Sequence, residues 1–174
     1  LAGLMETSDE WIQQRTGILE RRHIGADAGP SELALPAAQE ALRSAGVRAA
    51  DLDLILFGTL SPDIDFPSSA ALLQRQLGVR GMPAMDVRNQ CSGFLYMLAV
   101  ADKFIRTGGA RRVLVVGAEV HSTGLDLTTS GREVGVIFGD GAAACVLGVE
   151  SDTRRGILST HLHSEGKYAE KLMV

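Results

Sequence analysis

Cys91 stands where two sequence patterns meet, in the stretch DVRNQCSGFLYM at residues 86–97. An extended-looking segment precedes it and apolar residues at helical spacing follow it, so we expect the cysteine at the N-cap or in the first turn of a helix. The partial positive charge there stabilises a thiolate, the nucleophilic form of cysteine. The small residues Ser92 and Gly93 leave room for a substrate carbonyl. A core thiol that only packs is equally consistent with this local pattern.

Three continuous apolar runs predict the strands that would position this turn. They cover residues 53–58, 83–87 and 112–117, and such runs are typical of strands buried on both faces of a sheet. Helical periodicity predicts helices at residues 8–16, 31–46, 68–78 and 92–109. Strands that alternate with helices at this spacing predict a layered α/β fold with a mixed, mostly parallel central sheet.

Local signals add detail at the ends of these elements. The segment TSDE at residues 7–10 resembles a capping box at the start of the first helix. Further strands are predicted within residues 134–150 and 156–166. The polar, glycine-containing stretch at residues 121–133 is predicted to be a binding loop, because long irregular segments in compact domains are often functional.

The composition favours one globular domain whose partners are small molecules or other proteins. The chain has 174 residues, of which 45% are hydrophobic, and this is enough for one sizeable core. A net charge of −4 without a basic block argues against nucleic acid or an anionic membrane as a partner. Two cysteines without metal-ligand spacing predict neither a disulfide framework nor a metal site. No stretch approaches the roughly 20 apolar residues of a membrane span, so we expect a cytoplasmic protein.

Several short sequence motifs, in a fixed order, resemble those of one family. They are TSDEWIQQRTGI at residues 7–18, FPSSA at 66–70, the Cys91 segment, VLVVGAEV at 113–120, IFGDGAA at 137–143 and LSTHLH at 158–163. Together they resemble the β-ketoacyl-acyl carrier protein synthase III family of the thiolase superfamily, over nearly the whole chain. The resemblance implies a thiolase-like layered fold in which residues 1–174 form the N-terminal domain of a two-half architecture, incomplete at both ends.

The resemblance also implies a reaction for Cys91. In the family, the cysteine of this turn takes an acyl group from acyl-CoA as a thioester, and malonyl-acyl carrier protein then decarboxylates and attacks it. This condensation initiates fatty-acid synthesis. The resemblance therefore favours a catalytic role for Cys91 over a role in core packing. The implied partners are acyl-CoA, malonyl-acyl carrier protein and a second copy of the chain in a homodimer. No cofactor or metal is implied, since the coenzyme A thioester is a substrate.

Four further residues match binding positions of the family. Trp11 matches an indole that stacks on the adenine of coenzyme A, and Arg15 matches a cation near its phosphates, roles that suit a flat aromatic and a fixed cation. Arg132, in the predicted binding loop, matches an arginine on the other side of the adenine. Phe66 matches an aromatic that reaches the acyl pocket across a dimer interface. The alternatives are a core position for Trp11 and solvated charges for the two arginines.

Part of the family pattern has no match in this sequence. The second half of the family enzymes supplies a histidine and an asparagine that assist decarboxylation and bind the thioester carbonyl. None of the four histidines here lies in the matching context, so we expect residues 1–174 alone not to complete the condensation. Two other functions stay open: a related condensing enzyme of specialised metabolism, and a non-catalytic domain that binds coenzyme A.

Four other polar or thiol side chains are interpreted as structural. Asp140, in FGDG, is predicted to make a turn. His161 and His163 alternate with a leucine but lack a cluster of cysteines or carboxylates, so we expect polar strand residues and not metal ligands. Cys145 is flanked by apolar residues and is predicted to be a buried core thiol.

Overall fold

A four-stranded mixed sheet forms the centre of the computed structural model, which describes residues 1–25, 27–152 and 154–171. The strands are β1 (Leu54–Gly58), β2 (Ala84–Val87), β3 (Arg112–Glu119) and β4 (Gly141–Gly148), in the spatial order β2-β1-β3-β4. β1 pairs in parallel with both β2 and β3, whereas β4 pairs antiparallel with β3. The predicted mixed, mostly parallel sheet is therefore confirmed.

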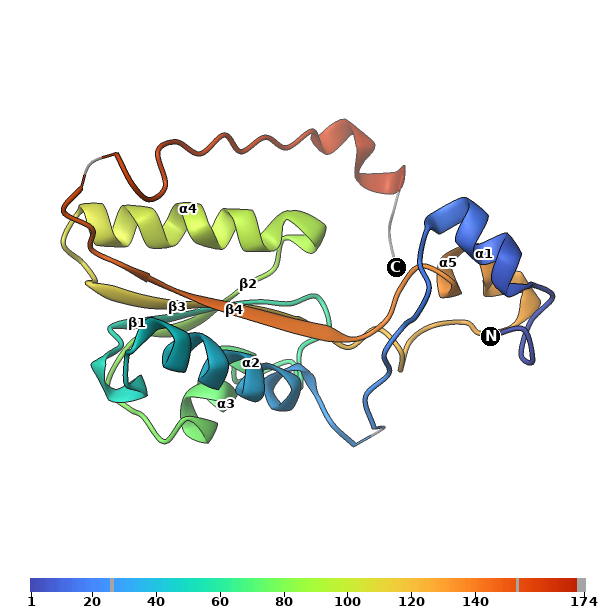
Figure 1. Ribbon diagram of the computed structural model, residues 1–174, viewed down its shortest axis with the longest axis horizontal. Coiled ribbons are helices and arrows are strands. Elements are labelled where there is room, and N and C mark those ends of the chain that lie inside the picture. The colour runs from blue at the N-terminus through green and yellow to red at the C-terminus, as the bar shows by residue number, and fades with distance from the viewer. Residues whose placement is uncertain (26, 153, 172–174) are drawn as a thin grey trace.

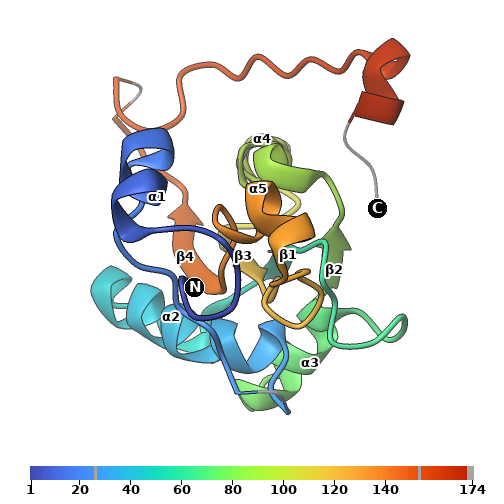
Figure 2. The same ribbon diagram turned by 90° about the vertical axis from the view of Figure 1, so that its right-hand side faces the viewer.

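Helices cover both faces of the sheet (Figure 1). α2 (Pro30–Ala45) and α3 (Ser69–Gln76) pack on one face, and α4 (Gly93–Arg106) packs along the other. α1 (Asp9–Thr16) and the short α5 (Arg132–Gly135) lie together beyond one end of the sheet (Figure 2). Single 3₁₀ turns occur at Ala49–Asp51, Gln90–Ser92, Thr129–Gly131 and Gly166–Lys171.

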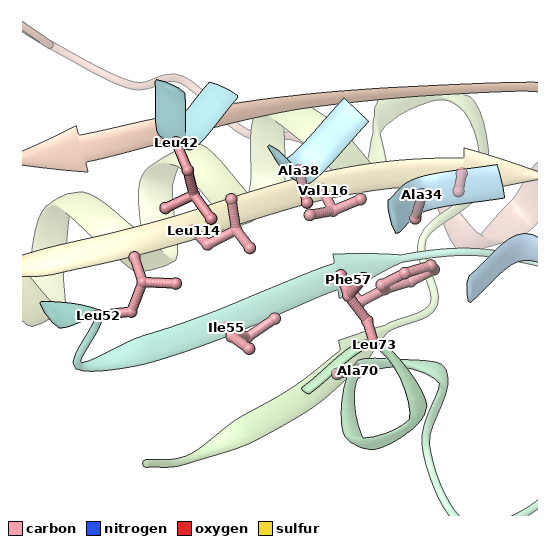
Figure 3. Packing of buried hydrophobic residues seen from close by; sticks show 11 residues of the cluster. Ala34, Ala38, Leu42, Leu52, Ile55, Phe57, Ala70, Leu73, Leu114 and Val116 are labelled. Carbon is pink, nitrogen blue, oxygen red and sulfur yellow. The ribbon is translucent and has the colours of Figure 1, made fainter. Parts of the chain in front are cut away.

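The side chains of β1 and β3 divide between two cores, because successive residues of a strand point to opposite faces of the sheet. On the side of α2 and α3 lie Ile55, Phe57, Leu114 and Val116 (Figure 3). On the side of α4 lie Leu54, Leu56, Val113 and Val115. All of these side chains are fully buried, which explains why continuous apolar runs encode these two strands.

All four predicted helices form, with small shifts at their ends. The hydroxyl of Ser8 caps α1 by accepting a hydrogen bond from the N–H of Trp11 at 3.1 Å. The predicted capping box is not completed, because Ser8 is the N-cap residue and Glu10 is then the second helical residue and not the third; its carboxylate accepts from the side chain of Gln14. Gly17 ends α1 in the left-handed conformation, at φ 70°. No helix in the described ranges is long and apolar enough to cross a membrane.

The prediction that the strand at residues 83–87 is buried inside the sheet is wrong. β2 is an edge strand that pairs only with β1, and its residues stay partly exposed. Its Asp86 carboxylate accepts hydrogen bonds from the N–H groups of Ser69 at 2.9 Å and Ala70 at 2.8 Å, at the start of α3. The strand thus presents a polar cap to that helix where a buried strand would present an apolar side chain.

The strand predicted within residues 156–166 does not form. This segment has no regular structure up to the final 3₁₀ turn, and it runs along α4, away from the free edges of the sheet (Figure 1). Two hydrogen bonds join it to α4: the Tyr96 hydroxyl donates to the His163 carbonyl at 3.2 Å, and Arg106 donates to the Ile157 carbonyl at 2.8 Å. Most of its side chains are exposed, so no buried face fixes a strand register.

The strand predicted within residues 134–150 is shorter than expected. Only Gly141–Gly148 forms β4, and the residues before it form the end of α5 and a turn. The predicted binding loop at 121–133 is mostly irregular, and its last part forms the 3₁₀ turn and the first residues of α5. This loop packs on α1 through Leu127 and Arg132.

Candidate active site

Cys91 lies on a short turn between β2 and α4. It belongs to the 3₁₀ turn Gln90–Ser92, and α4 begins at Gly93 with Ser92 as its N-cap residue. The cysteine therefore precedes the helix by one residue more than predicted, still next to its first turn. Its side chain is exposed, which contradicts the interpretation of Cys91 as a packed core thiol within this chain.

The sheet topology brings this turn and the predicted binding loop to one edge. Gly58, at the end of β1, pairs in register with Val87 of β2 and Gly117 of β3, so β1 and β2 end together and β3 continues for two more residues. The loop after β1, the Cys91 turn and the loop after β3 all leave from this carboxyl edge. Open α/β sheets bind ligands at the carboxyl ends of their strands, so this edge is the candidate site.

Glu119 organises the same edge, and sequence reasoning missed it. Its carboxylate accepts hydrogen bonds from the N–H groups of Leu60 at 2.8 Å and Ser61 at 3.2 Å, and from the Ser61 hydroxyl at 2.7 Å. The Ser61 oxygen in turn accepts from the N–H of Val120 at 2.8 Å. The loop after β1 is thereby tied to the end of β3. The sequence signal for this role was an acidic residue at the end of a buried strand. The hydrogen-bond partners of Glu119 become apparent only once the pairing of the strands is known.

Trp11 contacts two arginines from distant parts of the chain. The guanidinium carbons of Arg15 and Arg132 each lie 4.6 Å from the centre of the indole ring. A guanidinium group at this distance from an aromatic face makes a favourable cation–π contact. The structure therefore brings together three of the four binding residues expected from the resemblance, and we call Trp11, Arg15 and Arg132 the tryptophan cluster.

Apolar packing and backbone hydrogen bonds hold the tryptophan cluster in place. The buried members of the local hydrophobic core are Met5, Ile12 and Val136, with Leu1, Trp11 and Leu127 packed against them. Arg132 Nη1 donates to the carbonyl of Glu6 at 2.8 Å, and the N–H of Glu6 donates to the hydroxyl of Thr129 at 3.0 Å. Trp11 is half-buried, so it contributes to this small core and still offers part of its ring.

Asp140 does more than make the predicted turn. Its carboxylate accepts hydrogen bonds from the N–H of Ile24 at 2.7 Å, from the N–H of Ser122 at 2.9 Å and from the Ser122 hydroxyl. Burial alone would raise the pKa of Asp140, but these hydrogen bonds outweigh burial and hold the pKa below the ordinary aspartate value. Asp140 thereby ties the segment after α1 to the loop after β3.

Phe66 and Cys145 lie in different surroundings. Phe66 is in the loop between β1 and α3 and is 84% exposed, and no described contact joins it to the tryptophan cluster. Cys145 is in β4 and half-buried, less than predicted, because β4 is an edge strand. Burial raises the pKa of the Cys145 thiol, which disfavours its reactive form.

Two other candidate features carry no site chemistry. His161 and His163 are exposed, and no group of three or more histidine, cysteine or acidic side chains gathers for a metal within residues 1–25, 27–152 and 154–171. A shallow groove of about 390 Å³ lies on the α4 side. Its lining residues are Ala99, Val100, Lys103, Phe104, Thr160 and Leu162, with no cysteine, histidine or carboxylate among them.

Known proteins resemble this chain in sequence. Residues 85–166, which contain Cys91 and Arg132, match the family model of 3-oxoacyl-[acyl-carrier-protein (ACP)] synthase III. The beta-ketoacyl-[acyl-carrier-protein] synthase III of Xanthomonas campestris pv. campestris (strain 8004) is 51% identical over 172 residues, which cover 99% of this chain and 52% of that protein. The chain thus spans about half the length of the curated relatives that it matches.

Solved structures agree with the sequence comparison. The beta-ketoacyl-[acyl carrier protein] synthase III of Thermus thermophilus aligns with a TM-score of 0.90 and 38% identity, over 99% of this chain and 52% of that chain. The priming beta-ketosynthase of the R1128 polyketide biosynthetic pathway aligns with a TM-score of 0.79 and 33% identity, over 84% of this chain and 43% of that chain.

The sheet, its helical layers and the strand-to-helix turn at Cys91 define a thiolase-like fold. Within that class, the chain is similar to 3-oxoacyl-[acyl-carrier-protein] synthase III proteins, over about half of their length.

Proposed function

We propose that Cys91 is the acyl-accepting nucleophile of a condensing acyltransferase. The observation that carries the proposal is an exposed cysteine on the strand-to-helix turn at the carboxyl edge of the sheet. Its thiolate attacks the thioester carbonyl of acyl-CoA, a new sulfur–carbon bond forms, and the bond to coenzyme A breaks. Coenzyme A leaves as a thiol after it takes up a proton.

The second half-reaction uses malonyl-acyl carrier protein. Loss of carbon dioxide leaves an electron pair on the malonyl α-carbon, and this carbon attacks the carbonyl of the Cys91 thioester. A carbon–carbon bond forms, the bond to Cys91 breaks, and the sulfur leaves as a thiolate. The product is a β-ketoacyl group on the carrier protein, the first elongated intermediate of fatty-acid synthesis, and no further cofactor is needed.

The tryptophan cluster is the proposed site for the nucleotide end of coenzyme A. The indole of Trp11 offers a stacking surface for adenine, and the guanidinium groups of Arg15 and Arg132 offer positive charge for phosphates. An adenine that stacks on Trp11 should change the surroundings of the indole.

The proposed assembly is a cytoplasmic homodimer of subunits that each contain residues 1–174 as a thiolase-like domain. β2 is an edge strand with Met85 partly exposed, and an unpaired edge is a template for pairing with another chain. The exposed Phe66 suits a role in the acyl pocket of the partner subunit. Nucleic acid and membranes are not proposed partners, since the net charge is −4 and no basic block occurs.

Product analysis tests the activity. The protein that carries this chain, supplied with acetyl-CoA and malonyl-acyl carrier protein, should form acetoacetyl-acyl carrier protein, and Cys91→Ser should lower this rate by orders of magnitude while coenzyme A still binds. Cys145→Ser is the matched control and should retain activity, because Cys145 is half-buried and its pKa is raised by burial. Full activity in Cys91→Ser would refute the proposal.

A condensing enzyme of specialised metabolism is the second candidate. The likeness to the R1128 priming ketosynthase favours it, because that protein has the same fold at 33% identity. A series of acyl-CoA primers separates the two candidates: the fatty-acid enzyme should use a short primer with malonyl-acyl carrier protein, whereas the alternative should prefer another primer or acceptor. Coenzyme A binding without acyl transfer to any acceptor would instead indicate a non-catalytic binding domain.

A further inference from the structure

Arg132 donates a hydrogen bond to the backbone and forms no direct ion pair in the part of the chain that the structure describes. Its Nη1 donates to the carbonyl of Glu6 at 2.8 Å, and its guanidinium carbon lies 4.6 Å from the Trp11 ring centre. Its Nε is buried without a hydrogen-bond partner among the described residues. Because α5 is only four residues long, the position of this side chain depends on the turn that precedes it.

Asp126 builds that turn with its carboxylate. One oxygen accepts from the N–H of Thr128 at 2.9 Å and from its hydroxyl at 2.6 Å, and the other accepts from the Ser130 hydroxyl at 2.9 Å. The two hydroxyl groups also lie 2.8 Å apart. The neighbouring hydroxyl of Thr129 accepts from Glu6 at 3.0 Å, which joins the turn to the segment before α1.

Close packing in the turn adds to these hydrogen bonds. A Cβ atom at Gly131 would overlap the carbonyl oxygen of Asp126 and lie 2.6 Å from the Asp126 Cβ. Gly135 is nearly as confined, since its added Cβ would lie 3.1 Å from the same carbonyl oxygen. The backbone of Asp126 therefore lies close to both the start and the end of the segment that carries Arg132.

We propose that Asp126 is a positioning residue for the tryptophan cluster. Through this role it favours reaction of the protein with thioesters that carry an adenine nucleotide over thioesters that lack one. This inference rests on the proposed function. By fixing the 3₁₀ turn Thr129–Gly131, Asp126 sets Arg132 against Trp11. The resemblance to the family did not point to Asp126. The sequence signal that could have done so is the pattern DLTTS, in which an aspartate precedes hydroxyl residues in an Asx turn.

A positioning role and a purely electrostatic role of Asp126 predict opposite effects on coenzyme A binding when its carboxylate is removed. Coenzyme A carries several negative charges, so removal of a nearby carboxylate should strengthen its binding if charge alone matters. If Asp126 positions Arg132, its removal should weaken the use of coenzyme A thioesters. Glu133 is the matched control, because it is an exposed carboxylate on α5, next to Arg132, with no described contact to the turn.

The test compares acylation of Cys91 by acetyl-CoA and by acetyl-pantetheine, which lacks the nucleotide. Second-order rate constants come from mass spectrometry on the wild-type protein and on Asp126→Ala, Asp126→Asn, Glu133→Ala and Arg132→Ala. Fluorescence of Trp11, the one tryptophan of the chain, follows coenzyme A binding independently. Circular dichroism melting confirms that each variant is folded.

Asp126→Ala should slow acylation by acetyl-CoA about fivefold or more, near the effect of Arg132→Ala, while acylation by acetyl-pantetheine stays within about twofold. Asp126→Asn should recover most of the loss, because its amide oxygen can still accept from Thr128 and its nitrogen can donate to Ser130. Glu133→Ala should react like the wild type or slightly faster.

Three results would overturn this inference: an unchanged acetyl-CoA rate in Asp126→Ala, a faster one, or an equal fall with both substrates. Failure of the proposed function is distinguishable from these. It would show as no acylation of Cys91 in the wild-type protein, or as no effect of Arg132→Ala on the reaction with acetyl-CoA.

Discussion

At the scale of single residues, carboxylates hold the irregular segments around the candidate site. Asp140 receives hydrogen bonds from Ile24 and Ser122 on both of its oxygens. In Asp140→Asn an amide nitrogen would replace one oxygen and face at least one N–H donor. We expect a loss of about 1–3 kcal/mol in the free energy of unfolding, measured by urea denaturation. Asp65→Asn, at an exposed aspartate, is the control and should change little.

The same residue predicts a pH dependence. The pKa of folded Asp140 is lowered from the ordinary 3.8 because hydrogen bonds outweigh burial. Its stabilising contribution is therefore complete above the unfolded pKa and is lost as the pH falls through the lower folded pKa. The stability difference between wild type and Asp140→Asn should be constant from pH 7 to about 5 and shrink below about 4. A difference that grows on acidification would contradict this assignment.

At the scale of elements, Asp86 links β2 to α3 just before the Cys91 turn. Its carboxylate accepts from the N–H groups of Ser69 and Ala70, whereas Ser68 caps the same helix through the N–H of Ala71 at 3.2 Å. Asp86→Ala leaves two N–H groups without a partner and should cost about 1–2 kcal/mol in the free energy of unfolding. Ser68→Ala removes one cap and should cost less. Equal stability of Asp86→Ala and wild type would refute this role.

Elements whose residues face a core on both sides could be predicted from sequence. β1 and β3 follow directly from their continuous apolar runs, and α1, α2, α3 and α4 follow from their spacing, whereas the four-residue α5 was not predicted. The prediction placed β2 inside the sheet, because a short run of apolar residues does not show which strand lies at the edge of the sheet. The prediction of a strand at 156–166 was wrong, because that segment lies on α4 with exposed side chains. The alternation of residue types there does not correspond to a buried face.

The candidate site divides in the same way. The helix that follows Cys91 could be predicted from local spacing, and the resemblance pointed to Trp11, Arg15 and Arg132. The hydrogen bonds of Asp126 and Glu119 could not be predicted, because they depend on how loops meet at the carboxyl edge of the sheet. Side chains whose role is to position other side chains are difficult to recognise in a single sequence.

At the scale of the whole molecule, the exposed edge strand and Phe66 lead to a prediction about assembly. Light scattering on the protein should give twice the mass of one subunit, and Phe66→Glu should raise the dimer dissociation constant by about tenfold or more. Leu158→Glu is the control, since Leu158 is 72% exposed but lies in the segment over α4. A stable monomeric wild-type protein would contradict the proposed dimer.

The acyl group on Cys91 is the central claim at this scale, and peptide mass spectrometry measures it directly. After incubation with acetyl-CoA, the protein should carry one acetyl group on the peptide that contains Cys91 and none on the peptide that contains Cys145. Cys91→Ser should abolish this thioester, and hydroxylamine should release it from the wild-type protein, as expected for a thioester but not for an amide. An unmodified Cys91, or equal acetylation of both cysteines, would contradict the account.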